Sequence, residues 1–222
     1  MKAYLVPTLV AALTVAGAAS AQTMATVATD LNVRSGPGVQ HGVIGAIGAG
    51  DEVSVLGCID SANWCQVSGD GLEGWAYGDY LNVKAGDEVV SLYPNRETVG
   101  VTIIEAPVED PTTGQDAAVG GLGGAAMGAL IGGPVGAVAG LAIGGATGAA
   151  AAEEPTTEVT TYVTSNAVDP VYLDGEVVIG AGVPENVTIY EIPDQPDYRY
   201  AQINGQTVLV NPNDRQITYI YR

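Results

Sequence analysis

The side chains that could do covalent chemistry are few in this sequence. It contains one histidine, His41, and two cysteines, Cys58 and Cys65. No Cys/His spacing typical of a zinc site occurs. Acidic neighbours such as Asp51 and Glu52 would point to opposite faces of a strand, so they do not make the carboxylate pair of a glycosidase. Without a nucleophile-base pair, we expect no enzyme, no metal and no cofactor.

Arginine and aromatic side chains in the first third of the chain are the candidates for non-covalent ligand binding. Arg34 could receive a carboxylate through two parallel hydrogen bonds. Tryptophan and tyrosine combine an apolar body with a polar tip, which suits a binding groove. The aromatic candidates are Trp64, Trp75, Tyr77 and Tyr80. The alternatives are structural: the arginine braces a turn, the tryptophans lie in the core or beside a cysteine, and the tyrosines pack at the barrel edge.

The N-terminus has the features of a secretory signal peptide over residues 1–21. Lys2 precedes an apolar stretch, and Ala21 ends a small-x-small tripeptide of the kind cleaved on export. A cut three residues earlier is the alternative. We expect a mature protein in the periplasm or outer envelope. In that oxidising compartment Cys58 and Cys65 should form a disulfide, although a redox pair is the alternative.

The charge of the chain excludes two classes of partner. Seven basic residues face 25 acidic ones, which gives a formal net charge of -18. Nucleic-acid binding depends on neutralising phosphates with Lys and Arg, so we expect no nucleic-acid partner. The same charge argues against electrostatic docking on anionic lipid.

Short apolar runs separated by turn residues organise the segment from 22 to 83. Gly-Pro and Gly-Asp-Gly sequences punctuate runs such as residues 43–47 and 64–67. Five or six such strands predict a small β-barrel. Residues 84–116, which are acidic and contain prolines, are predicted to be a linker.

The same segment resembles a bacterial SH3-like domain. The matching stretches are residues 31–38 (LNVRSGPG), 50–55 (GDEVSV), 64–67 (WCQV) and 71–81 (GLEGWAYGDYL). The two cysteines fit a variant of this family that bridges the barrel. The resemblance implies a binding module of the cell envelope, with peptidoglycan stem peptides or cross-bridges as frequent targets.

Residues 117–152 consist mostly of glycine and alanine, with a glycine at every fourth position. These glycines are Gly120, Gly124, Gly128, Gly132, Gly136, Gly140, Gly144 and Gly148. Small residues at this spacing let helices approach closely. Pro134 should break the helix, which predicts a hairpin of helices near 118–131 and 135–151. The segment resembles glycine-zipper regions of envelope proteins, which implies membrane contact or a homo-oligomer. A flexible linker and a hairpin packed on its own domains are the alternatives.

The chain returns to strand-like runs over residues 168–222, after a second predicted linker at 153–167. Asn204-Gly205 lies between two alternating runs and predicts a tight hairpin. We expect a small antiparallel β module. It resembles a C-terminal domain of unknown function found in alphaproteobacterial envelope proteins, through residues 182–184, 200–210 and 215–217. That resemblance implies a location and no activity.

These patterns predict a mainly β protein with a small SH3-like barrel, a Gly/Ala-rich helical hairpin and a C-terminal β module. The expected function is that of an exported, non-enzymatic protein that binds peptidoglycan or an envelope protein, with the hairpin giving membrane association or oligomerisation. Two alternatives stay open. In one, the chain is a structural or stress-related membrane protein whose barrel has no ligand. In the other, it is an accessory subunit of a cell-wall hydrolase.

Overall fold

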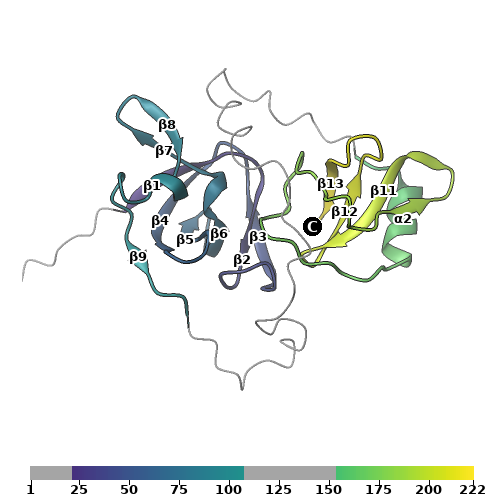
Figure 1. Cartoon of the computed structure of the whole chain (residues 1–222), viewed down its shortest axis with the longest axis horizontal. Helices are drawn as coiled ribbons and strands as arrows, with labels where there is room; N and C mark the ends of the chain where they lie inside the picture. The colour runs from purple at the N-terminus through teal and green to yellow at the C-terminus, as the bar shows by residue number, and fades with distance from the viewer. Residues whose placement is uncertain (1–21, 108–153) are drawn as a thin grey trace, which may run out of the picture.

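The computed structural model of the chain describes residues 22–107 and 154–222 (Figure 1). We call these two parts the N-terminal module and the C-terminal module. The predicted signal peptide and the predicted glycine hairpin lie outside the described residues. Within the described ranges, no helix is both long enough and apolar enough to cross a membrane.

The N-terminal module is a nine-stranded sheet that curls around its own core. The strands run in the order β3-β2-β6-β5-β4-β1-β7-β8, all antiparallel, and β9 pairs in parallel with β4. Their bounds are β1 (Thr23–Val27), β2 (Leu31–Arg34), β3 (Val43–Ile47), β4 (Glu52–Ile59), β5 (Trp64–Gly69), β6 (Leu72–Tyr77), β7 (Leu81–Ala85), β8 (Glu88–Ser91) and β9 (Ile103–Ile104). Two 3-10 turns, η1 (Gly78–Tyr80) and η2 (Tyr93–Asn95), complete the module.

Alternation of apolar residues explains how these strands close over a core. In β4, Val53 and Val55 are buried while the intervening Ser54 is half-buried, as expected for side chains that alternate between two faces. The module extends beyond the predicted boundary at residue 83. Residues 84–91 continue β7 and form a hairpin with β8, and β9 adds to β4, so this part of the predicted linker belongs to the sheet.

The C-terminal module is a four-stranded antiparallel sheet in chain order, covered by one helix. Its elements are α2 (Thr157–Ser165), β10 (Tyr190–Ile192), β11 (Gln195–Ile203), β12 (Gln206–Val210) and β13 (Ile217–Tyr221). Asn204 and Gly205 both have positive φ angles, 51° and 79°, as the predicted two-residue hairpin requires. In the apolar run 177–179, Val177 and Val178 are buried and Ile179 is half-buried, but the run forms no strand.

Helix α2 lies where the sequence predicts a linker. Thr156 caps its first turn by accepting a hydrogen bond from the Val159 main-chain nitrogen at 3.4 Å. Val159 and Val163, one helical turn apart, are buried against the sheet beside Leu209 and Tyr200. The helix is rich in Thr and Val, which are weak helix formers, so its stability comes from this packing.

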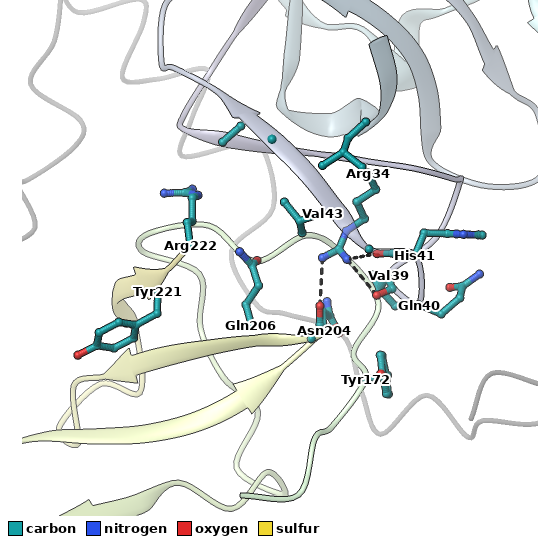
Figure 2. A pocket seen from close by; sticks show the side chains of 15 residues that line it. Arg34, Val39, Gln40, His41, Val43, Tyr172, Asn204, Gln206, Tyr221 and Arg222 are labelled. Atoms are coloured by element: carbon teal, nitrogen blue, oxygen red, sulfur yellow. Dashed lines mark hydrogen bonds between the residues drawn. The ribbon is translucent and has the colours of Figure 1, made fainter. Parts of the chain in front are cut away.

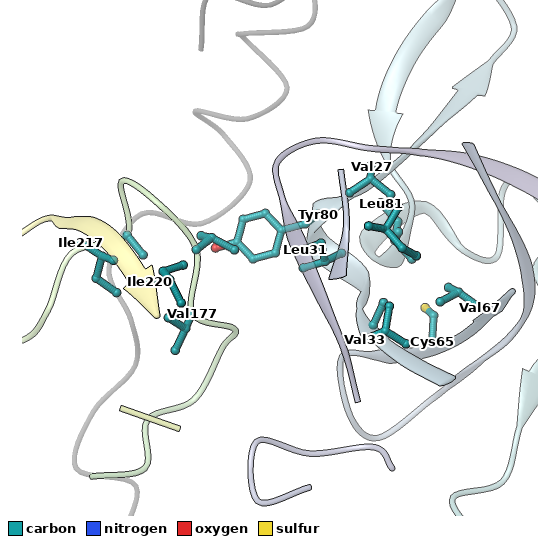
Figure 3. Packing of buried hydrophobic residues seen from close by; sticks show 14 of the residues in the cluster. Val27, Leu31, Val33, Cys65, Val67, Tyr80, Leu81, Val177, Ile217 and Ile220 are labelled. Carbon is teal, nitrogen blue, oxygen red and sulfur yellow. The ribbon is translucent and has the colours of Figure 1, made fainter. Parts of the chain in front are cut away.

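The two modules share one apolar core. A single cluster of buried side chains joins Leu31 and Tyr80 of the N-terminal module to Val177 and Ile220 of the C-terminal module. Figure 3 shows the Tyr80 ring reaching out of the barrel toward Val177 and Ile220. The modules are therefore packed into one body.

Candidate functional site

Arg34 lies at the centre of the junction between the two modules. Its side chain is 1% exposed, and all five of its N–H groups have an acceptor. Nε donates to Glu176 Oε2 at 2.5 Å, and Nη2 donates to Glu176 Oε1 at 2.7 Å. Nη1 donates to the main-chain oxygens of Val39 and His41, at 3.1 and 2.7 Å. The remaining Nη2 bond reaches the Asn204 oxygen at 3.3 Å.

Glu176, the acidic partner, is completely buried in the same network. Its Oε1 also accepts from the side chain of Asn32 at 3.0 Å and from the main-chain nitrogen of Val177 at 2.8 Å. Asn32 in turn donates to the Gln206 side chain at 2.8 Å. Every charge in this network is hydrogen-bonded, which is the condition under which buried ionic groups are tolerated.

The Asn204 side chain holds the loop that delivers Glu176. Its amide donates to the oxygens of Leu173 and Gly175, and its carbonyl accepts from the Leu173 nitrogen at 2.8 Å. The hairpin turn between β11 and β12 is thus tied to the loop before Glu176. One turn therefore positions both the main-chain acceptor and the carboxylate that meet Arg34.

A pocket of about 490 Å³ opens beside this network, between the modules (Figure 2). One wall is the N-terminal module's loop 39–42 with residues 43–46 of strand β3. The other wall comes from the C-terminal module: Tyr172, the hairpin turn 204–206, Tyr221 and Arg222. Arg34 also lines the pocket and bonds to both walls, because its acceptors include Val39, His41 and Asn204.

The predicted ligand-binding residues do not gather in this pocket. Arg34 lines it but is occupied by a carboxylate of the same chain. Trp64 and Trp75 are 6% and 7% exposed and form a small apolar cluster with Ile59, onto which Val39 and Ile104 pack. At these positions the side chains have structural roles. Arg34 braces a loop, and the two tryptophans are core side chains.

The two tyrosines lie next to each other near Trp64. The Tyr77 ring stacks edge-on against Trp64 with centroids 5.5 Å apart, and it lies 6.0 Å from the Tyr80 ring. Tyr77 is half-buried, whereas Tyr80 belongs to the shared core. Burial is the main reason that the pKa of both hydroxyls is raised above 10.0, and the nearby charge of Asp79 adds to the effect. Both therefore stay neutral at physiological pH.

The predicted disulfide between Cys58 and Cys65 is present. The two residues face each other across strands β4 and β5 and are fully buried in the core. No group of three or more His, Cys, Asp or Glu in the described ranges could hold a metal ion.

Removing the disulfide should lower the stability of the N-terminal module measurably. A Cys58→Ala/Cys65→Ala variant of the mature chain is expected to lose about 2–3 kcal/mol of unfolding free energy, because the crosslink restricts a short loop of the unfolded chain. Urea unfolding of the oxidised protein, the reduced protein and the double variant measures this. Equal midpoints for the three samples would contradict it.

Several residues of the junction were not found from the sequence: Asn32, Glu176, Asn204, Gln206 and Arg222. Only Glu176 could have been suspected from the sequence, because it is an acidic residue directly before the apolar run Val177–Ile179. Such an acid is either at the surface or paired with a buried cation. The sequence does not show which cation, since the partner lies 142 positions away.

Two family comparisons match parts of the chain. The bacterial SH3 domain family matches residues 29–82, and a domain of unknown function, DUF1236, matches residues 162–222. These matches confirm the resemblances to the SH3-like domain and to the C-terminal domain of unknown function, and each lies within one of the two modules. The comparisons with curated proteins and with solved structures gave no match.

Proposed function

Since the chain joins a bacterial SH3 domain to a DUF1236 domain, we propose that it is an exported, non-enzymatic envelope protein that binds the peptides of peptidoglycan. The observation that carries this proposal is the SH3 match over residues 29–82. Domains of this family are binding modules, typically for peptidoglycan or for proteins. The signal-peptide pattern of residues 1–21 supports the same location.

The chemistry of the described residues supports binding over catalysis. Both cysteines are consumed by the disulfide, and the buried Arg34–Glu176 pair is fully engaged in holding the modules together. The pocket between the modules is lined by apolar and hydrogen-bonding side chains, as ligand sites usually are.

The glycine-rich segment 117–152 supplies the second part of the proposal. Its four-residue glycine spacing favours close helix contact, so we assign it membrane association or self-association. In this proposal the two packed modules recognise the wall peptide, and the glycine-rich segment attaches the protein to a membrane or to other copies.

Co-sedimentation of the mature chain, residues 22–222, with isolated sacculi tests the proposed function. Sacculi whose stem peptides have been removed by amidase digestion are the matched control. We expect saturable pelleting with intact sacculi that survives moderate salt, and little with peptide-free sacculi. Absence of pelleting with intact sacculi, or equal pelleting with both preparations, would show that the wall peptides are not the ligand.

A further inference from the structure

We propose that the DUF1236 domain forms the second half of the SH3 domain's ligand pocket, and that this pocket binds a short wall peptide through a carboxylate held by Arg222. The inference rests on the proposed function and gives the C-terminal domain a role in it.

The size and construction of the pocket fit a small ligand. Its volume of about 490 Å³ lies inside the range of roughly 300–1,000 Å³ that is usual for small-molecule sites. A folded protein partner needs a broad surface, whereas this hollow fits a few residues of peptide. Neither module encloses it alone, because residues 39–46 form one wall and residues 172, 204–206 and 221–222 form the other.

Strand β3 gives the pocket a wall suited to amide groups. It ends the strand order of the N-terminal sheet and, among the described residues, pairs only with β2. The N–H and C=O groups of an edge strand can therefore hydrogen-bond to a bound peptide. Ile44 of this strand is 47% exposed and adds an apolar contact.

The lining of the pocket lacks acidic side chains, although the chain is strongly acidic. The chain carries a formal charge of -18, yet no Asp or Glu is among the described residues that line the hollow. The charge of Arg34 is met by Glu176. Arg222 is exposed. Among the described residues, its guanidinium donates hydrogen bonds to two neutral oxygens, Asn32 Oδ1 at 3.2 Å and the Asp30 main-chain oxygen at 3.3 Å. A carboxylate is a stronger acceptor for a guanidinium than either.

Arg34 acts as a positioning residue for this pocket. Its guanidinium ties the loop at Val39 and His41 to the hairpin turn at Asn204, so both walls are fixed before a ligand arrives. A preformed site does not have to order its walls on binding, which favours affinity.

Calorimetric titration of the mature chain tests the inference. The probe is a disaccharide-tetrapeptide released from sacculi by muramidase, and the matched ligand is the same compound with its terminal carboxylate converted to the amide. We expect Arg222→Gln to weaken binding of the carboxylate form by about tenfold or more, because it removes one charge-assisted contact. We expect a loss of similar size from Ile44→Glu, because it replaces an apolar contact by an acid that repels the ligand carboxylate. The amide should bind about tenfold more weakly to the unmodified protein, and Arg222→Gln should remove that preference.

Two control variants make the same chemical changes elsewhere. Met24→Glu places an acid at an exposed apolar position of strand β1, and Arg199→Gln removes an arginine from the surface of β11. Both should bind within about twofold of the unmodified chain, because neither residue lines the pocket.

The outcomes separate the inference from the proposed function. If the chain pellets with intact sacculi but Ile44→Glu and Arg222→Gln bind the probe as tightly as the unmodified protein, the peptide binds elsewhere and the inference is wrong. If the chain neither pellets with sacculi nor binds the probe, the proposed function and the inference both fail.

Discussion

Replacing Arg34 by methionine is expected to lower the free energy of unfolding of the mature chain by about 3–5 kcal/mol. The substitution leaves the Glu176 carboxylate fully buried without its cation, and it removes the donors to Val39, His41 and Asn204. Urea unfolding measures the loss.

A double-mutant cycle distinguishes the ion pair from ordinary packing. Arg34→Met combined with Glu176→Leu removes both charges, so the double variant should lose clearly less stability than the sum of the single variants. Arg199→Met is the control, since Arg199 pairs with a Glu191 that is 83% exposed, and it should cost about 1 kcal/mol or less. Two results would contradict a buried ion pair that holds the modules together. One is stability losses that add up across the cycle, and the other is a loss for Arg34→Met no larger than that of the control.

Replacing Tyr80 by alanine is the second substitution expected to have a large effect. The ring is 6% exposed in the core shared by the two modules, so its removal should cost about 3–5 kcal/mol through lost contacts and a cavity. Because the ring packs toward Val177 and Ile220, the loss should appear in the C-terminal module as well as in the barrel.

Tyr80→Phe is the matched variant, because it keeps the ring and removes only the hydroxyl. It should retain most of the stability that the alanine variant loses. Urea unfolding followed by tryptophan fluorescence reports on the N-terminal module, which holds both tryptophans, and amide circular dichroism reports on both modules. The two probes should give one coincident transition. A Tyr80→Ala protein as stable as Tyr80→Phe would show that this ring does not join the modules.

Local sequence patterns predicted the elements that depend on local chemistry. Glycine turns and apolar alternation located most strands of the barrel, and Asn204-Gly205 located the hairpin, since both signals are contained in a few neighbouring residues. Helix α2 was missed because its Thr and Val residues favour strands, and only packing against Leu209 and Tyr200 makes the helix stable.

The site depended on contacts that no local pattern contains. The sequence left two roles open for Arg34, binding a ligand carboxylate or bracing a turn. In the structure it braces the loop at Val39 and His41 and pairs with Glu176 of the same chain. The pairing of these residues depends on how the modules dock. The pocket has the same origin, because its walls belong to segments more than a hundred residues apart.

Nitrogen-15 NMR of the mature chain, titrated with the disaccharide-tetrapeptide, tests most directly whether the two domains form one binding body. We expect amide shifts to change together on both walls of the pocket, in residues 43–46 of the SH3 domain and at Tyr221 and Arg222 of the DUF1236 domain. Shifts confined to one domain, or centred on the Trp64 and Tyr77 face of the barrel, would contradict a pocket built by both.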